Sequence, residues 1–483
     1  MPKKFYITTA IPYVNASPHI GFALELVQAD AVARYHRQKN EDTFFLTGAD
    51  ENSLKNVQAA EIEGLAVRAL VDRNTAKFVA LTKALNISND DFIRTVSEKH
   101  FAGAQKLWAA CRPEDLYKKK YKGLYCVGCE QFYTQKELVD GKCPEHQTKP
   151  EVVEEENYFF KLSNYQKRLE KLIASDEYRI VPETKKNEVL SFIRMGLEDF
   201  SISRSQQRAK NWGVPVPGDP TQVMYVWFDA LSNYITGLDY ATAGQLYQDY
   251  WLKNENRVHV IGKGIIRFHA VYWPAMLMSA GLDLPKTLFV HGYINIGGGK
   301  MSKSLGNVVD PFALVEKYGA EVVRYYLLRH IHPVVDSDFD LKSLEQAYNA
   351  DLANGLGNLV SRVSGLIEQN NVKIKVDSKK LPVQSAKDLD QLMAQFVFDQ
   401  ALKFIWAKVS ELDSYISEKK PWAMAKIESQ KKELTECLTK AAAEILAIAS
   451  LLKPFLPQTA AKIEKIFTAP KIKKGESLFP RLT

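Results

Sequence analysis

Cysteine is scarce in this sequence, with five residues among 483. So few thiols exclude a disulfide framework as the main source of stability, and we predict a reducing compartment, the cytoplasm. Long apolar runs are missing too. The best candidate, residues 441–452, is shorter than the roughly 18 residues that a membrane span requires, so we predict a core helix there and no membrane association. The start, with Lys3 and Lys4, leads directly into a strand pattern, and no secretory signal is expected.

A large charge of one sign is also absent. Lysines and arginines number 64 against 57 aspartates and glutamates, which gives a formal net charge of +7. This mild excess permits a polyanionic partner without requiring one. The chain is rich instead in apolar residues, 46% of the total. Its length predicts about three packed domains of ~150 residues each.

The N-terminal segment has the pattern of a strand, a turn and a helix. Residues 5–10 are β-branched and aromatic, residues 11–18 contain two prolines, and a helical composition follows to about Arg37. His19 and Gly21 would then lie at the start of a helix, where unpaired N–H groups bind anions. The alternative is an ordinary βα unit with an incidental histidine.

A second buried strand is predicted over residues 42–48. Strand, helix and strand at this spacing indicate a parallel βαβ unit, and hence a doubly wound sheet. Asp50 would follow the second strand at its carboxyl end, where such sheets bind ligands. Its alternative role is to cap the next helix.

Two short pairs of metal-ligand residues follow, Cys126 with Cys129 and Cys143 with His146. Each pair has two residues between its ligands, the spacing of a closed tetrahedral zinc site of the structural kind. Three unrelated cysteines and a stray histidine are the alternative. The remaining cysteines, Cys111 and Cys437, are predicted to be ordinary thiols.

Lys300 and Lys303 follow the run Gly297-Gly298-Gly299. Two lysines on a loop can neutralise the charge that develops on a polyphosphate, although such pairs are usually solvated surface. Combined with Pro18-His19-Ile20-Gly21, the segment Lys300-Met301-Ser302-Lys303-Ser304 resembles the two signatures of class I aminoacyl-tRNA synthetases. The rest of the chain narrows this resemblance to methionyl-tRNA synthetases, of the bacterial type with one zinc site.

The resemblance implies a ligase that activates methionine with ATP and transfers it to tRNA(Met), including initiator tRNA. It implies catalytic roles for His19, Gly21, Lys300 and Lys303. ATP would be bound by His19, Gly21, His291, Gly292, Lys300, Ser302 and Lys303. Mg²⁺ would accompany ATP, held mostly by phosphates and water. The zinc would be structural.

A methionine pocket is implied by the same resemblance. Its residues would be Ile11, Tyr13, Asp50, Arg204, Trp227, Ala230, Leu231, Tyr234, Ile265 and His269, with Arg204 as the partner of Asp50. A polarizable thioether favours aromatic walls, and hydrogen bonds from Tyr234 and His269 near the sulfur would favour it over an alkyl chain. The alternative is that these aromatic residues belong to the hydrophobic core and not to a ligand pocket, as aromatic residues at strand ends usually do.

The C-terminal part, from residue 343, is predicted to be a helix bundle. Asn354, Asn358 and Arg362 share one helix face, and Trp422 follows Pro421. Such groups can read unpaired bases, and they match the anticodon-binding residues of the family. A polar bundle face with a buried tryptophan is the alternative.

The predicted fold is therefore a doubly wound, parallel-sheet nucleotide-binding domain that is interrupted by a zinc-bearing insertion and followed by an α-helical bundle. Its parts are the first half of the nucleotide domain (1–115), the insertion (116–220), the second half (221–299), the lysine loop with a stem-contact region (300–342) and the anticodon domain (343–483). Residues 222–230 are predicted to be a strand. With no further domain in view, we expect a monomer.

Some positions depart from the family pattern. Phe22 replaces a common second histidine, Gly264 a frequent aspartate and Leu231 a frequent proline, and no His-Gly pair follows the acidic residues Asp50 and Glu51. Two alternatives stay open. One is a class I enzyme of other specificity, such as cysteine, in which zinc would keep an open position. The other is a non-catalytic relative that binds tRNA.

Overall fold

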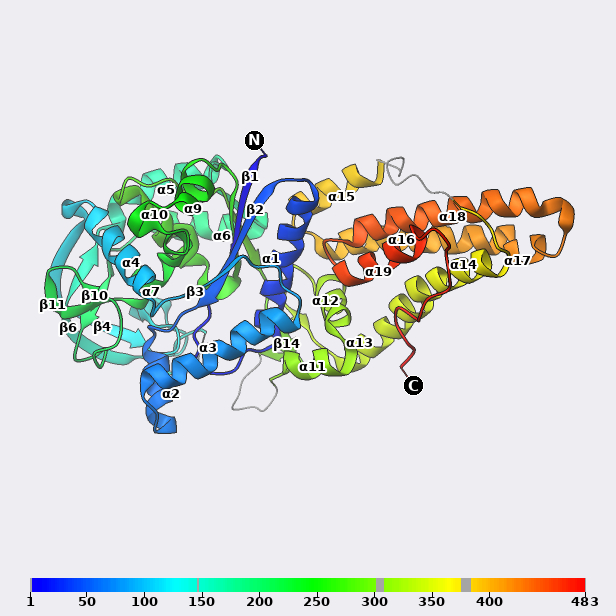
Figure 1. Cartoon of the computed structure of the whole chain (residues 1–483). Helices are drawn as coiled ribbons and strands as arrows, with labels where there is room; N and C mark the ends of the chain where they lie inside the picture. The colour runs from blue at the N-terminus through cyan, green and yellow to red at the C-terminus, as the bar shows by residue number, and fades with distance from the viewer. Residues whose placement is uncertain (1, 146, 301–307, 375–383, 483) are drawn as a thin grey trace. The chain divides into compact units, whose positions relative to one another are not determined.

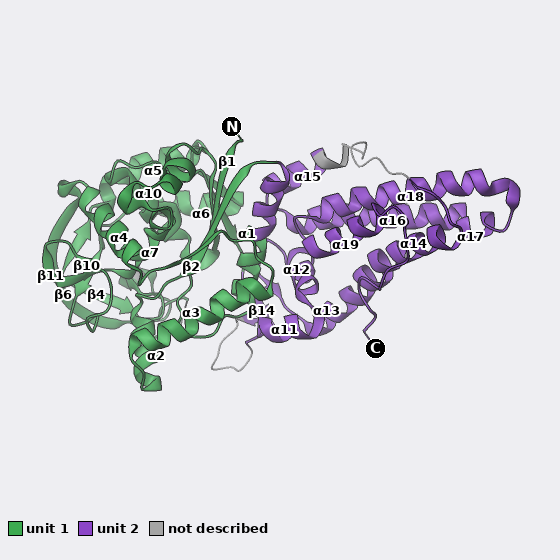
Figure 2. Ribbon diagram, viewed as in Figure 1, with its two compact units in different colours: residues 1–29, 40–292 green, residues 30–39, 293–483 purple. Residues whose placement is uncertain are grey.

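The computed structural model describes residues 2–145, 147–300, 308–374 and 384–482. The chain forms two compact units, coloured separately in Figure 2. Unit 1 contains residues 1–29 and 40–292, and unit 2 contains residues 30–39 and 293–483. In the part of the chain that the structure describes, no helix is both long and apolar enough to cross a membrane.

The centre of unit 1 is a six-stranded sheet whose strands all run parallel (Figure 1). In spatial order its strands are β3 (Asp91–Arg94), β2 (Asp42–Ala49), β1 (Lys4–Thr9), β12 (Arg257–Gly262), β13 (Thr287–His291) and β7 (Arg179–Val181). The order reverses between β1 and β12, and this switch point is where doubly wound sheets bind ligands, at the carboxyl ends of the strands. The predicted strand at residues 5–10 and the βαβ unit are confirmed.

Burial explains the strand composition. Every residue of β1 after Lys4 is buried, as expected for a parallel strand covered by helices on both faces. Gly48 in β2 is required by close packing, because a Cβ there would lie 2.3 Å from the carbonyl oxygen of Ile93 in β3.

Helices of unit 1 connect and cover these strands. The first is α1 (Ile20–Gln38), which follows β1 and continues into unit 2. The others are α2 (Leu54–Glu63), α3 (Val67–Ala84), α4 (Glu98–Ala110), α5 (Gln166–Ala174), α6 (Glu183–Arg194), α7 (Val226–Leu231), α8 (Asn233–Thr236), α9 (Gln245–Tyr247) and α10 (Trp273–Ser279). A 3₁₀ turn, η6 (Lys263–Ile265), and a π-helical turn, η7 (Phe268–Tyr272), lie between β12 and α10.

The predicted insertion at 116–220 forms small antiparallel sheets, with one exception. One sheet contains β5 (Gln131–Tyr133), β4 (Leu116–Cys126), β6 (Glu151–Phe160) and β8 (Phe200–Ser201), and another contains β10 (Pro215–Val216), β11 (Asp219–Met224) and β9 (Ser203–Ser205). The exception is β7, which pairs with β13 at the edge of the parallel sheet. The insertion is therefore not one block, because the chain rejoins the central sheet at residue 179, before the predicted end of the insertion at residue 220.

A second correction concerns the predicted strand at 222–230. Strand β11 ends at Met224, and Trp227 and Ala230 lie on the short helix α7. A short run of β-branched and aromatic residues is compatible with both a strand and a buried helix, so its periodicity alone does not distinguish the two structures.

Unit 2 is mainly helical. Its small sheet contains β15 (Gly299–Lys300), β14 (Ile294–Ile296) and β16 (Ser337–Asp338). Its helices are α11 (Pro311–Tyr318), α12 (Ala320–Arg329), α13 (Leu341–Ala347), the π-helical segment η9 (Tyr348–Gly357), α14 (Asn358–Gln369), α15 (Gln384–Ala394), α16 (Phe398–Lys419), α17 (Pro421–Met424), α18 (Lys431–Leu452) and α19 (Pro457–Phe467). Helix α18 packs against α14, α16 and α19, and the predicted core helix at 441–452 lies within it.

Candidate functional site

Strands of the central sheet end in residues that the sequence singled out. β1 leads into Ile11 and Tyr13, β2 into Asp50, and β13 ends at His291. Tyr13 and Asp50 form an isolated parallel bridge, and the Asp50 N–H donates to the Pro12 carbonyl at 2.9 Å. The candidate site therefore lies at the carboxyl edge of the sheet, next to the switch point between β1 and β12.

A hydrogen-bonded pair, Tyr234 and His269, is buried in this part of unit 1. The Tyr234 hydroxyl lies 2.6 Å from His269 Nε2, and His269 Nδ1 lies 2.9 Å from the Ile265 carbonyl oxygen. Because a carbonyl only accepts, Nδ1 carries the ring proton. Burial lowers the pKa of His269 to about 4, so the ring is neutral at pH 7 and Nε2 accepts from the Tyr234 hydroxyl.

This geometry corrects one expectation. The only hydroxyl proton of Tyr234 and the only ring proton of His269 are both used within the protein, so neither group has a donor left for a thioether sulfur. The two rings can contact a ligand through polarizable surface, but neither can donate a hydrogen bond to its sulfur.

Aromatic stacking forms a second wall. The Trp227 ring lies on the Phe268 ring with centroids 3.7 Å apart and planes 6° apart. Ile11, Tyr13, Leu231 and Ile265 belong to the same apolar cluster as Trp227 and Tyr234. Ala230 is buried on α7, close in sequence to Trp227. Most apolar residues of the predicted methionine pocket thus belong to, or pack against, the core of unit 1, and their roles in binding stay predictions.

Asp50 is buried among other acidic side chains. Desolvation, and then the carboxylates of Asp229 and Glu130, raise the pKa of Asp50 well above its ordinary value. The hydroxyl of Tyr13, its bridge partner, is buried and has no hydrogen-bond partner among the residues that the structure describes. A carboxyl buried among other carboxyls and a buried hydroxyl without a hydrogen bond each lower the stability of the folded protein. Groups with such perturbed surroundings are typical of ligand sites.

The expected pairing of Asp50 with Arg204 is wrong. Arg204 Nη2 lies 2.9 Å from Glu130 Oε2 and 3.1 Å from the Tyr125 hydroxyl. The other oxygen of Glu130 accepts from Ser53 Oγ at 2.5 Å. Glu130 therefore takes the place of Asp50 as the counter-ion of Arg204, and it ties the segment after Cys129 to the cap of helix α2.

The predicted ATP residues lie near the ends of β1 and β13. His19 precedes α1, and its Nδ1 accepts from the Gly21 N–H at 3.1 Å. His291 Nε2 lies 2.9 Å from Glu25 Oε2, and Nδ1 lies 2.7 Å from the Gly292 carbonyl oxygen. Phe22, where the family pattern has a histidine, is buried against Phe78 with ring centroids 5.2 Å apart, so packing replaces the polar contact.

Part of the predicted lysine loop lies outside the residues that the structure describes. Lys300 ends the strand β15 in unit 2. Ser302 and Lys303 lie outside the described residues, as does His146 of the predicted metal site.

The three other predicted metal ligands converge. The sulfur atoms of Cys126, Cys129 and Cys143 lie within 4.8 Å of one another, and those of Cys129 and Cys143 are 3.3 Å apart. None of them forms a disulfide. A tetrahedral zinc ion with Zn–S bonds of ~2.3 Å holds its ligand atoms ~3.8 Å apart, so the cluster fits such an ion.

The predicted anticodon residues lie in unit 2. Asn354 on η9, Asn358 on α14 and Trp422 on α17 are exposed, with Trp422 at 42%. Trp422 is thus not the buried core residue of the alternative. Arg362 is half-buried, and its Nη2 lies 2.8 Å from Asp413 Oδ1.

Comparison with known proteins adds an independent finding. The family described as tRNA synthetases class I (M) matches residues 5–149 and 146–364. The methionine–tRNA ligase of Brucella melitensis biotype 1 is 43% identical, over 98% of this chain and 93% of that protein. The ligase of the same name from Clostridium acetobutylicum is 41% identical, over 99% of this chain and 78% of its own length. The chain belongs to the methionyl-tRNA synthetases.

A solved structure agrees with this assignment. Mycobacterium tuberculosis methionyl-tRNA synthetase in complex with methionyl-adenylate is similar with a TM-score of 0.90 and 38% identity, over 99% of both chains. The doubly wound fold with an insertion and a helical C-terminal region is thereby confirmed for this synthetase.

Sequence reasoning missed several polar residues of this synthetase's site. Asp229 accepts from Asn52 Nδ2 at 2.8 Å and is bonded to His100 Nε2, and all three side chains are buried. A signal was present for Asp229, because it is the only charged residue in the run Val226–Leu231. Glu130 had a weaker signal, its position directly after the ligand Cys129.

Proposed function

We propose that this methionine–tRNA ligase works in two steps at the carboxyl edge of the central sheet. The methionine carboxylate attacks the α-phosphate of ATP, which gives methionyl-adenylate and pyrophosphate. The terminal adenosine of tRNA(Met), initiator tRNA included, then attacks the adenylate carbonyl. The observation that carries the proposal is the neutral Tyr234–His269 pair beside the Trp227–Phe268 stack, an uncharged and polarizable pocket suited to a thioether.

Asp50 would hold the amino group of methionine. Its carboxyl lies in a buried acidic environment, and no described residue forms a hydrogen bond with the neighbouring Tyr13 hydroxyl. A bound ammonium group would supply the missing counter-charge and lower the pKa of Asp50 again. Binding energy would thus be gained where the free protein is electrostatically strained.

The phosphates of ATP would lie at the start of α1. His19 precedes the first turn, and Gly21 has no side chain to obstruct a nucleotide. His291, Gly292, Lys300, Ser302 and Lys303 complete the proposed ATP site. Mg²⁺ would be held mainly by phosphate oxygens and water, and the two lysines would neutralise charge in the transition state.

The tRNA would be bound by unit 2 as well. Exposed amides at Asn354 and Asn358 can read base edges, and the exposed face of Trp422 can stack on an unpaired base. Arg362 would have to exchange its ion pair with Asp413 for a base or a phosphate. We further propose a monomer that works in the cytoplasm, where free thiols are stable.

ATP–pyrophosphate exchange tests the first step. We expect exchange with methionine among the twenty amino acids, in the absence of tRNA. Because neither Tyr234 nor His269 has a hydrogen-bond donor left for sulfur, norleucine should be activated with a kcat/KM within about 100-fold of methionine. Lys303→Ala should lower the exchange rate by about 10²- to 10³-fold.

Other outcomes would contradict the proposal. Exchange with cysteine instead of methionine would assign a different class I specificity. Absence of exchange from folded, metal-loaded protein would favour a tRNA-binding relative without catalysis. Rejection of norleucine by far more than 100-fold would require a donor to sulfur other than Tyr234 and His269.

The metal is proposed to be one structural Zn²⁺, held by Cys126, Cys129, Cys143 and His146. We expect Cys143→Ser to abolish zinc binding and to lower the melting temperature by several degrees, while Cys437→Ser keeps one zinc per chain. Zinc analysis and calorimetry measure both effects. A zinc-free protein that melts normally but prefers another amino acid would indicate a substrate-binding metal instead.

A further inference from the structure

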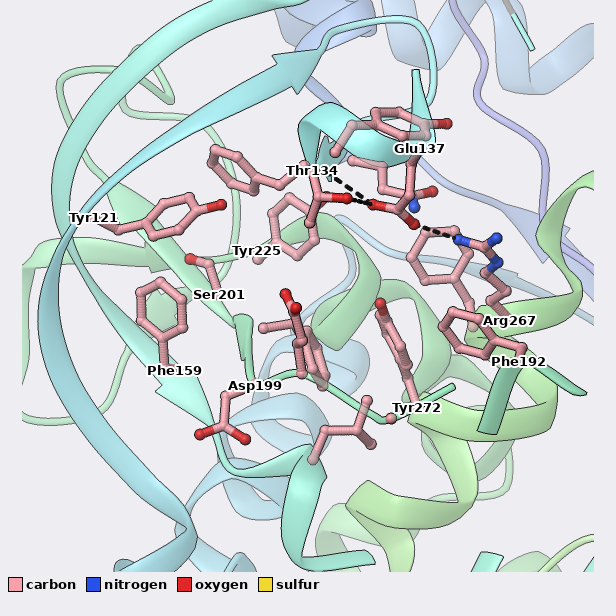
Figure 3. A pocket seen from close by; sticks show the side chains of 18 of the residues that line it. Tyr121, Thr134, Glu137, Phe159, Phe192, Asp199, Ser201, Tyr225, Arg267 and Tyr272 are labelled. Atoms are coloured by element: carbon pink, nitrogen blue, oxygen red, sulfur yellow. Dashed lines mark hydrogen bonds and ion pairs between the residues drawn. The ribbon is translucent and has the colours of Figure 1, made fainter. Parts of the chain in front are cut away.

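A cavity of about 330 Å³ lies in unit 1. It is lined by strands β4, β5, β6 and β8 on one side and by the end of α6 and η7 on the other (Figure 3). Figure 3 shows Tyr121 and Phe159 on the side opposite Tyr272 and Arg267. Among the described residues, it shares Phe268 with the proposed methionine pocket, because that ring also stacks on Trp227.

Its wall is mostly aromatic. The aromatic residues that line it are Tyr121, Phe132, Tyr133, Phe159, Phe192, Phe200, Tyr225, Phe268 and Tyr272. Ring faces carry negative electrostatic potential and attract cations.

Tyr225 is the most informative of these residues. Its side chain is only 4% exposed, and its hydroxyl forms no hydrogen bond with any described residue. Burial raises the pKa of Tyr225 well above its ordinary value, so the phenol stays protonated. A hydroxyl at a cavity wall with no protein partner is available to bond to an occupant of the cavity.

The charges of the lining have one dominant sign. Arg267 is already paired, with Nη1 2.8 Å from Glu137 Oε1. Glu198 also lines the cavity, and no described residue pairs with it. Asp199 accepts from Tyr117 and Ser163, and none of the described residues forms an ion pair with it. Three carboxylates thus face one guanidinium in the lining.

We propose that this cavity is a second small-molecule site, which binds an organic cation with an apolar body, such as a protonated arylalkyl amine. The aromatic walls contact the body, the Tyr225 oxygen accepts from the ammonium group, and Glu198 and Asp199 supply the counter-charge. An anion would meet the carboxylates, and a neutral ligand would leave their charge unused.

The site is coupled to the methionine pocket through one side chain, and this part rests on the proposed function. Phe268 lines the cavity, and the same ring stacks on Trp227 with centroids 3.7 Å apart. An occupant packed against Phe268 holds this stack in place. It should therefore change the apparent affinity for methionine.

Calorimetric titration of the zinc-loaded full chain tests the site directly. The probes are phenethylammonium and the neutral 2-phenylethanol, which share the aromatic body. We expect the cation to bind at least about tenfold more tightly, with an affinity that falls as salt increases. Equal binding of the two probes, or no binding of the cation, would overturn the proposal.

Matched variants locate the binding. Tyr225→Phe keeps the ring and removes only the hydroxyl, and Glu198→Gln removes one charge; each should weaken cation binding about tenfold. Glu188→Gln, on the exposed face of α6 and outside the lining, should leave binding unchanged. Unchanged affinity in both cavity variants would place the cation elsewhere and overturn the proposal.

The coupling has a separate readout. Saturating phenethylammonium should change the KM for methionine in pyrophosphate exchange about threefold or more, and Phe268→Leu should reduce that change. Binding with an unchanged KM would refute the coupling. Because titration needs no catalysis, a protein without exchange activity would refute the proposed function and leave the test of the cavity intact.

Discussion

Asp50→Asn is expected to stabilise the free protein by about 1 to 2 kcal/mol and to lower methionine activation by about 10²- to 10³-fold. Asparagine has nearly the same shape and keeps the oxygen that accepts from the Asn52 N–H. It removes a charge that is buried beside Asp229 and Glu130. It also removes the proposed counter-ion of the methionine amino group.

The pH dependence of this effect has a definite sign. The pKa of Asp50 is raised in the folded state, so folding favours the protonated carboxyl. Stability from this group is present below the ordinary pKa of aspartate, about 4, and is lost as pH rises toward the raised pKa. The stability advantage of Asp50→Asn should therefore grow with pH over this window and then stay constant.

Denaturant titrations at several pH values, together with pyrophosphate exchange, measure both effects. Asp140→Asn is a matched control, because Asp140 is exposed and its φ of 52° suits asparagine equally well. We expect the control to change the free energy of unfolding by less than about 0.5 kcal/mol. An Asp50→Asn protein that is destabilised, or that keeps full activity, would refute the proposed role.

Glu130→Ala is expected to cost about 3 to 5 kcal/mol of stability. The Glu130 carboxylate is fully buried and bonds to the Arg204 guanidinium, the Tyr125 hydroxyl and the Ser53 hydroxyl. Removing it leaves a buried cation, with Arg204 only 5% exposed, without its counter-ion. Breaking one partner of such a pair costs far more than an exposed pair is worth.

Urea denaturation measures this cost. Glu154→Ala is the control, since its pair with Lys122 has an N–O distance of 3.7 Å and both side chains are more than two-thirds exposed. That variant should lose at most about 1 kcal/mol. Replacing Arg204 by methionine in the Glu130→Ala background should restore part of the loss. A double variant no more stable than Glu130→Ala would show that packing, and not charge, causes the effect.

Much of the site could be predicted from the sequence. The ends of β1 and β2 were visible as apolar runs followed by Tyr13 and Asp50, because burial on both faces of a parallel sheet requires such runs. The cysteine cluster was visible because ligand spacing is a local property. The ion pair between Arg204 and Glu130 could not be predicted from the sequence. Which carboxylate pairs with an arginine depends on proximity in the folded protein, and Glu130 lies 74 residues from Arg204 in the chain.

The sequence by itself determined the family, the first βαβ unit and the residue types at the carboxyl edge, because these depend on short-range patterns. Tertiary structure decided which partners those residues have. In the folded protein Arg204 forms an ion pair with Glu130, and both hydrogen-bond donors of the Tyr234–His269 pair bond to other protein groups. Tertiary structure also returned β7 to the central sheet and formed a cavity beside Phe268. Burial and hydrogen-bond pairing are properties of the packed chain, and no local pattern in the sequence encodes them.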